Sequence, residues 1–262
     1  MAHGNETITH RDGAQSLPAT ALDRPDLDRA TRRGIPEVIL ADSKSADQVI
    51  AIARQFLAST GRALISRLPD AMLPQVVAAL PEAESLRFPL SHALRLTLPG
   101  TPPPTSGGHI GIITAGTSDI PYADEARFIA EAMGCQVTCI FDVGVAGVHR
   151  LFDPLNALIT NGADVAIVAA GMDGALPSLV AGLVPFPVIG LPTPIGYGMG
   201  GQGEGALLAM LQSCSPGLVV VNIGNGIGAG AVAALIANRV ATVRHASPSD
   251  ATAAPFVEVA TN

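Results

Sequence analysis

The side chains best suited to chemistry gather in five glycine-rich segments of the second half of the chain. The first segment, residues 115–121, places Gly116, the Thr117 and Ser118 hydroxyls and the Asp119 carboxylate just before a proline. Proline suits the first turn of a helix, because its missing N–H is not needed there. Free amides at a helix start, together with hydroxyls, bind phosphate or hydroxylated ligands. The alternative is that Ser118 or Asp119 only caps the helix.

The second and third segments add groups that transfer protons or hold anions. Residues 142–150 begin with Asp142 and end with His149 and Arg150, an imidazole beside a guanidinium. Residues 171–177 place Asp173 between Gly171 and a second glycine, and glycines let a ligand approach the backbone closely. The alternatives are a histidine with a structural role and an aspartate that only caps a helix.

The last two segments are dominated by glycine. Residues 192–203 hold seven Gly or Pro in twelve positions, which predicts a mobile active-site loop. This loop has neither the Walker-A lysine nor the strand and helix that flank a dinucleotide fingerprint. Residues 222–230, with Asn225 and Gly226, are typical of a strand-to-helix turn that binds phosphate, or of a plain tight turn.

Three cysteines offer thiol chemistry. Cys214 lies between a predicted helix and a predicted strand, so topology places it at the edge of the sheet opposite the five segments. It is an awkward nucleophile within one subunit, unless helix-end geometry or a neighbouring subunit brings it to the site. Cys135 and Cys139 are interpreted as buried structural thiols, and without a third or fourth ligand nearby they predict no zinc site.

An alternation of strands and helices positions these segments. Strands over 109–114, 136–141, 164–169, 187–191 and 218–221 alternate with helices over 121–133, 147–160, 176–183, 203–212 and 228–238. Strands that are apolar on both faces indicate a parallel sheet covered on each side. We therefore predict a doubly wound α/β fold with a mostly parallel, flavodoxin-like five-stranded sheet, which binds ligands at the carboxyl ends of its strands.

A smaller unit precedes this fold. Residues 23–98 alternate short strands with helices over 45–58 and 70–80, which predicts a small N-terminal α/β domain with Ser45 as a helix N-cap. Pro and Gly fill seven of the ten positions 99–108, so we place a linker there and the catalytic domain at 109–240. Residues 1–22 are predicted to be a disordered tail and residues 241–262 a flexible one.

Composition and net charge argue against some classes of function. The chain of 262 residues is 48 % hydrophobic and only 14 % charged, with a net charge of −7. The negative balance argues against binding to nucleic acid or to an anionic membrane. The low charge content favours a homo-oligomer. No secretory segment or window of about 20 uninterrupted apolar residues is present, so we expect a cytoplasmic protein.

Seven segments resemble one known family, LarB, which makes the precursor of the nickel-pincer cofactor of lactate racemase. They are RRGIPEVIL (32–40, followed by Lys44), TAGTSDIP (114–121), DVGVAGVHRL (142–151), VAAGMDGALPSLV (168–180), PTPIGYG (192–198), ALLAMLQSCSPG (206–217) and VVNIGNGIGAG (220–230). The catalytic domain is more distantly similar to aminoimidazole ribonucleotide (AIR) carboxylases and mutases, whose phosphate loop resembles residues 116–119. Those enzymes lack a counterpart of Cys214 and the front domain.

The resemblance implies an AIR-carboxylase-like fold and a defined reaction. Nicotinic acid adenine dinucleotide would be carboxylated at C5 of the pyridinium by carbon dioxide or bicarbonate. Hydrolysis of its phosphoanhydride would release AMP and pyridinium-3,5-biscarboxylic acid mononucleotide, with Mg²⁺ as counter-ion. Cys214 matches the family's nucleophile, and Asp173 stands where relatives carry Glu. Gly224 stands where relatives carry Asp, and the related carboxylases imply an octamer.

Two other functions compete with this one. A purine-pathway carboxylase or mutase would use the same loops, but Cys214 and the front domain count against it. A non-catalytic nucleotide-binding module would keep the loops without turnover, and Asp173 and Gly224 are its only hints.

Overall fold

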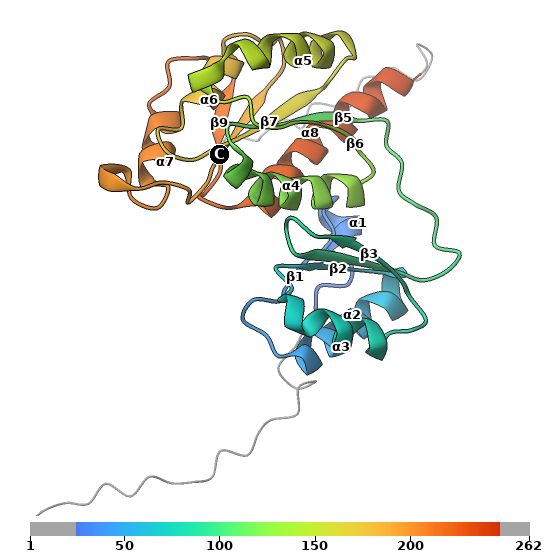
Figure 1. Ribbon diagram of the computed structural model, residues 1–262. Coiled ribbons are helices and arrows are strands. Elements are labelled where there is room, and N and C mark those ends of the chain that lie inside the picture. The colour runs from blue at the N-terminus through green and yellow to red at the C-terminus, as the bar shows by residue number, and fades with distance from the viewer. Residues whose placement is uncertain (1–24, 247–262) are drawn as a thin grey trace, which may run out of the picture.

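The computed structural model describes residues 25–246, which form two sheets with their helices (Figure 1). The tail predicted over residues 1–22 lies outside the described residues, as does the end of the chain from residue 247. The larger sheet has five strands, β5 (His109–Thr114), β6 (Gln136–Ile140), β7 (Val165–Ala170), β8 (Val188–Pro192) and β9 (Leu218–Val220). Their order is β6-β5-β7-β8-β9 and every pair is parallel, which confirms the predicted flavodoxin-like sheet.

Helices cover both faces of this sheet, as its apolar strands require. On one face lie α4 (Ile120–Ala132) and α8 (Gly226–His245), packed on inward side chains such as Ile112 and Ile167. On the other face lie α5 (His149–Thr160), α6 (Ala175–Ala181) and α7 (Glu204–Leu211), packed on Ile113 and Val168. Alternate residues of the central strands therefore feed two separate cores.

The front unit is a four-stranded sheet in the order β1-β2-β4-β3. Its strands are β1 (Ile39–Leu40), β2 (Arg62–Ser66), β3 (Glu84–Phe88) and β4 (Ala93–Thr97). The helices α2 (Ala46–Thr60) and α3 (Leu73–Ala79) pack on one face, and a short α1 (Arg29–Arg33) precedes β1. The predicted N-cap is confirmed, because the Ser45 side chain accepts a hydrogen bond from the Gln48 amide in a capping box.

The other face of the front sheet packs on the C-terminal domain. Leu64 and Phe88 belong to the same core as Phe128 and Ile129 of α4, and the Phe88 and Phe128 rings meet edge to face at 5.1 Å. Figure 1 shows α4 and α8 between the two sheets. Apolar contact therefore joins the two units into one packed structure.

Helix α8 is longer than predicted. The flexible tail was placed from residue 241, but the helix continues to His245. It begins at the Asn225 N-cap, and its alanines and glycines pack against α4 along much of its length. By length and composition α8 is long and apolar enough to cross a membrane, but eight of its 20 residues are buried inside the protein.

The close approach of α4 and α8 depends on Gly230. A Cβ there would collide with the Ala126 carbonyl oxygen and the Ile129 side chain. We expect Gly230→Ala to destabilise the protein by about 1–3 kcal/mol through overpacking, although alanine favours helix more than glycine. Val243→Ala on the same helix, where Val243 is 68 % exposed, should change stability by less than about 0.5 kcal/mol. Urea unfolding at fixed protein concentration measures both, and a stabilised Gly230→Ala protein would contradict the packing.

Candidate functional site

The five glycine-rich segments meet at one edge of the large sheet, because the carboxyl ends of parallel strands point the same way. The chain leaves β5 toward β6 on one side, while β7 flanks β5 on the other. This reversal of strand order is where doubly wound folds bind ligands. The loops after β5, β7 and β8 are neighbours there.

Asp119 ties three of these loops together. Its carboxylate accepts hydrogen bonds from the Gly116 amide at 2.8 Å and from the Thr193 hydroxyl at 2.6 Å. The Gly171 amide contributes a further hydrogen bond. Asp119 and Thr193 are both buried. Both carboxylate oxygens are thus held by protein donors, so Asp119 braces the site, whereas the sequence predicted a direct ligand contact.

Burial raises the pKa of Asp119 above its usual range, and the hydrogen bonds from Thr193, Gly116 and Gly171 oppose that rise. The folded state therefore holds this proton more tightly than the unfolded chain does. The carboxyl's contribution to stability is greatest below the unfolded pKa. It declines as pH rises toward the folded pKa.

The hydroxyls before Asp119 face outward. Thr117 and Ser118 are exposed in a 3-10 turn, Thr117–Asp119, that leads into α4. Their side chains form no hydrogen bond within residues 25–246. They are therefore free to bind a ligand, and the capping alternative for Ser118 finds no support in these hydrogen bonds.

The loop after β6 contains an ion pair. Asp142 has a left-handed backbone with φ +59° and lies 2.7 Å from the Arg150 guanidinium. Its amide donates to Thr114 Oγ1 at 3.1 Å, so the strained residue is anchored to the end of β5. His149 begins α5 beside Arg150 and is exposed. The predicted pair of an imidazole and a guanidinium is present, with Asp142 bound to Arg150.

The loops after β7 and β8 border an open cavity of about 420 Å³, lined by Asp173, Met172 and Tyr197. Met172 is left-handed at φ +51°, and its amide donates to the Ile195 carbonyl at 2.6 Å. A Cβ at Gly171 would collide with that carbonyl, so only glycine permits this approach. Asp173 is exposed and caps α6 loosely, since its Oδ1 lies 3.4 Å from the Ala175 amide. Its carboxylate is available to a ligand in the cavity.

The loop after β9 is fixed by its own side chain. Asn225 Oδ1 accepts from the Gly228 amide at 2.8 Å and caps α8, and Gly226 is the first, buried residue of that helix. Gly224 has φ +66°, a conformation that Asp tolerates better than most residues. A Cβ there would lie 3.4 Å from the Tyr122 ring.

The front domain reaches the same edge through Arg67, which sequence reasoning missed. Its Nε donates to the buried Glu125 carboxylate at 3.0 Å, and its Nη2 donates to the Gly224 carbonyl at 3.1 Å. The Ser66 hydroxyl donates to the same carboxylate at 2.6 Å. Arg67 has φ +55°, and this strain is typical of functional or tightly held positions. The one signal in the sequence was the carboxylate of Glu125 on an apolar helix face. Local patterns could not connect it with its partners, because Arg67 and Ser66 lie 58 and 59 residues away.

The cysteines are placed largely as predicted. Cys214 is exposed in the loop between α7 and β9, at the edge opposite the other groups. The neighbouring Ser215 donates to the Ser178 carbonyl of α6 at 2.9 Å. Cys135 is buried and donates to Asn238 Oδ1 at 3.0 Å, whereas Cys139 is only half-buried because it lies on the edge strand β6.

Few side chains at this edge of the sheet can coordinate a metal ion. Within residues 25–246, no three His, Cys, Asp or Glu side chains lie close enough together to hold an ion. Asp119 has both oxygens occupied and Asp142 is paired, which leaves Asp173 as an open carboxylate at the cavity. This donor set suits Mg²⁺ bound chiefly through substrate phosphates, with one carboxylate from the protein.

Comparison with known proteins identifies the family of each domain. The AIR carboxylase family matches residues 109–254, and the LarB/PurE-like N-terminal domain family matches residues 19–89. An uncharacterized protein of Methanocaldococcus jannaschii is 40 % identical over 216 residues, which cover 81 % of this chain and 82 % of that protein. The N5-carboxyaminoimidazole ribonucleotide mutase of the same organism is 35 % identical over 129 residues, covering 49 % of this chain and 75 % of the mutase. A crystal structure of a PurE2 variant from Treponema denticola aligns at a TM-score of 0.41 and 18 % identity, covering 52 % of this chain and 81 % of that one.

The C-terminal domain is therefore an AIR carboxylase domain. Because the same chain also carries the LarB-type N-terminal domain, it belongs to the LarB family.

The Asp119–Thr193 hydrogen bond is open to a double-mutant cycle. Asp119→Ala leaves the buried Thr193 hydroxyl without its acceptor, and Thr193→Val leaves a buried carboxylate oxygen without its donor. Each change should cost about 1–3 kcal/mol, with a coupling energy of about 1–3 kcal/mol between them. Ser118→Ala, next to the brace but exposed, should cost less than about 0.5 kcal/mol. Urea unfolding of the four proteins gives the coupling, and additive effects would show that the brace is absent.

Thiol labelling tests the placement of the cysteines. Burial raises the pKa of the Cys139 thiol to about 11 and also raises the pKa of Cys135, so few thiolates form there near neutral pH. Iodoacetamide at pH 7.5 should modify Cys214 at least about tenfold faster than the other two, as followed by peptide mass spectrometry. All three should react in urea. Equal rates in the folded protein would contradict the assignment.

Proposed function

We propose that the protein carboxylates nicotinic acid adenine dinucleotide at C5 of the pyridinium ring and hydrolyses its phosphoanhydride. The products would be pyridinium-3,5-biscarboxylic acid mononucleotide and AMP, the first step toward a nickel-pincer cofactor. The observation that carries the proposal is an exposed Cys214 in a chain of LarB architecture. A purine-type carboxylation has no need of such a thiol.

The chemistry explains why a thiol is needed. A pyridinium carbon has no nucleophilic character and cannot attack carbon dioxide. Addition of the Cys214 thiolate to the ring gives a dihydropyridine, an enamine whose C5 carries the electron pair. C5 attacks carbon dioxide and forms the new C–C bond. Loss of the C5 proton and departure of the thiolate then restore the aromatic ring.

The loops at the sheet edge supply the other roles. Asp173 faces its cavity with an open carboxylate, so we assign it the C5 proton or the positioning of water and metal. His149 is assigned proton transfer, and Arg150 with Asp142 an anion contact. The exposed Thr117 and Ser118 hydroxyls and the backbone at Gly116, Gly171, Asn225 and Gly226 would hold phosphate or ribose.

Hydrolysis of the phosphoanhydride would need a cation to balance the negative charge of the phosphates. Mg²⁺ would be held by the substrate's phosphates and by Asp173, and it would stabilise the negative charge that develops on the phosphate oxygens.

The position of Cys214 supports an oligomeric enzyme. Within one chain α6 separates the Asp173 loop from the Cys214 loop, and a helix of seven residues is about 10 Å long. We therefore propose a homo-oligomer, an octamer like the related carboxylases, in which Cys214 of one copy faces the loops of another.

A second candidate, an N5-carboxyaminoimidazole ribonucleotide mutase, has one observation in its favour. Relatives with that name align with about half of this chain, which also matches the AIR carboxylase family over residues 109–254. That function would leave Cys214 without a role.

A product assay separates the candidates. The wild-type protein is incubated with nicotinic acid adenine dinucleotide, bicarbonate and Mg²⁺, and mass spectrometry should detect the dicarboxylated mononucleotide and AMP. Cys214→Ser should abolish carboxylation, because an alkoxide forms far less readily than a thiolate at neutral pH, while substrate binding survives. Cys139→Ser is the matched control and should keep the activity.

Ser118→Ala should instead raise KM about fivefold with little change in kcat, as expected when a hydrogen bond of about 1 kcal/mol to bound substrate is lost. Near-wild-type carboxylation by the Cys214→Ser protein would overturn the thiol-adduct mechanism. Turnover of an aminoimidazole ribonucleotide with none of the dinucleotide would favour the mutase.

A further inference from the structure

Two arginines of the front sheet face the C-terminal domain at the far end of α4. Arg62 begins β2, and Arg95 of β4 pairs with Leu64, two residues along from Arg62. Such diagonal neighbours lie about 7–8 Å apart on the same face of a sheet, so the two long cationic side chains share one space. Leu64 on this face packs into the core with α4, which identifies the face that looks toward the C-terminal domain.

Neither guanidinium has a partner in the part of the chain that the structure describes. Within residues 25–246, the side chains of Arg62 and Arg95 form no hydrogen bond and no ion pair. Desolvation lowers the pKa of Arg62, and the charge of Arg95 lowers it further. In a chain with a net charge of −7, folding has thus brought two like charges together, and neither forms an ion pair within residues 25–246. An arrangement that costs stability in the free protein is typical of a binding site.

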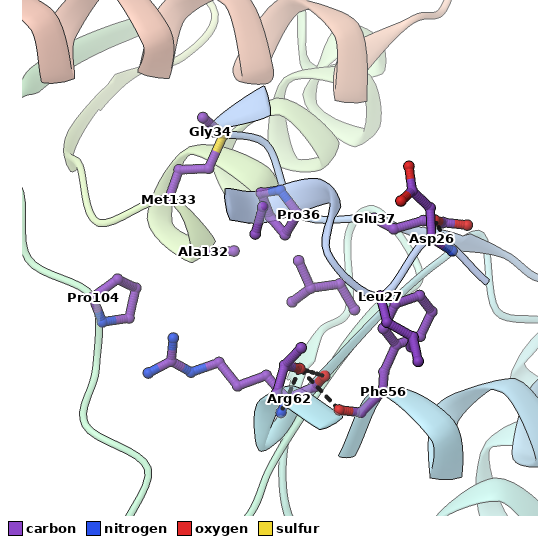
Figure 2. A pocket seen from close by; sticks show the side chains of 13 residues that line it. Asp26, Leu27, Gly34, Pro36, Glu37, Phe56, Arg62, Pro104, Ala132 and Met133 are labelled. Carbon is purple, nitrogen blue, oxygen red and sulfur yellow. Dashed lines mark hydrogen bonds between the residues drawn. The ribbon is translucent and has the colours of Figure 1, made fainter. Parts of the chain in front are cut away.

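The space around them consists of two adjoining cavities. One, of about 250 Å³, is mostly apolar, and Leu27, Phe56 and Met133 line it (Figure 2). The other, of about 420 Å³, is lined by Arg95, Glu84, Thr97 and Thr101. Arg62, Pro104 and Ala132 line both, and Figure 2 shows the Arg62 side chain extended toward Pro104.

The carboxylates nearby offset only part of the charge of the pair. Glu84 also lines the cavity that contains Arg95, but it is exposed and forms no ion pair in the described chain. Burial raises the pKa of Glu131, and the charges of Arg127, at 3.9 Å, and of Arg95 oppose that rise. At the far wall of the apolar cavity, Asp26 pairs with Arg32, and Glu37 accepts from the Asp26 amide. The cationic end of the double cavity is therefore open to an anion.

We propose that this double cavity binds a small phosphate monoester with an apolar or aromatic body. The phosphate lies between Arg62 and Arg95 within reach of the hydroxyls, because guanidinium forks match phosphate oxygens. The body fills the apolar cavity. The site is separate from the sheet-edge loops, since α4 begins at those loops and its 13 residues span about 20 Å.

The location also predicts what binding does. The lining comes from the front sheet, from the connecting segment at Pro103 and Pro104, and from the end of α4. A molecule bound there contacts both domains at once and therefore stabilises their junction. This inference does not depend on the reaction proposed above.

Calorimetric titration with phenyl phosphate at constant ionic strength tests the proposal, with inorganic phosphate and benzyl alcohol as partial probes. Phenyl phosphate should bind the full-length protein saturably and at least tenfold more tightly than either partial probe. Arg62→Gln and Arg95→Gln should each weaken binding at least tenfold, while Arg239→Gln, an exposed arginine of α8, and Ser118→Ala should leave it unchanged.

Thermal melts show whether a variant that fails to bind is still folded. Without ligand, Arg62→Gln and Arg95→Gln should melt no lower than wild type, because each relieves the repulsion. Phenyl phosphate should raise the melting temperature of wild type but not of these two. Wild-type affinity in both arginine variants, or no saturable binding by wild type at millimolar ligand, would overturn the site. Equal affinities for phenyl phosphate and inorganic phosphate would overturn the apolar half of the assignment.

Discussion

The hydrogen bond from Thr193 to the buried Asp119 carboxylate holds the loops of the sheet edge in one arrangement. Asp119 follows β5 and Thr193 follows β8, and the carboxylate also accepts from Gly116 and Gly171 amides. A buried charge is costly unless it is fully hydrogen-bonded. Loss of any one of the three donors therefore destabilises the whole arrangement around the carboxylate. These hydrogen bonds also fix the loops that carry the exposed Ser118 hydroxyl and the Asp173 cavity.

A second buried carboxylate, Glu125, performs the same task between the two domains. Ser66 and Arg67 of the front domain both donate to it, and Arg67 also reaches the Gly224 carbonyl of the last loop. The front domain is therefore joined to the sheet edge by a charged network as well as by the shared apolar core. Substitutions at this junction should consequently affect the site even where they lie far from it in sequence.

The sequence predicts local features well and long-range ones poorly. Strand and helix order and the Ser45 cap follow from apolar patterns, capping residues and proline, which act over a few positions. The hydrogen bond between Asp119 and Thr193 could not be predicted, because the two residues lie 74 positions apart. Arg67 was missed for the same reason. The end of α8 was placed too early, because its last turn is held by partners far away in the sequence: Ala241 is buried beside Gly107, and Arg244 pairs with Asp164.

The central claim is that Cys214 of one copy completes a site built by the loops of another. Cys214→Ser and Asp173→Asn proteins, each inactive alone, are co-expressed with different tags, and the mixed oligomers are purified and assayed for the dicarboxylated mononucleotide. Random assembly should restore about a quarter of wild-type activity, because intact Cys214 and Asp173 then meet across some interfaces. Mixed oligomers as inactive as the separate variants, beside an active wild type, would contradict the claim.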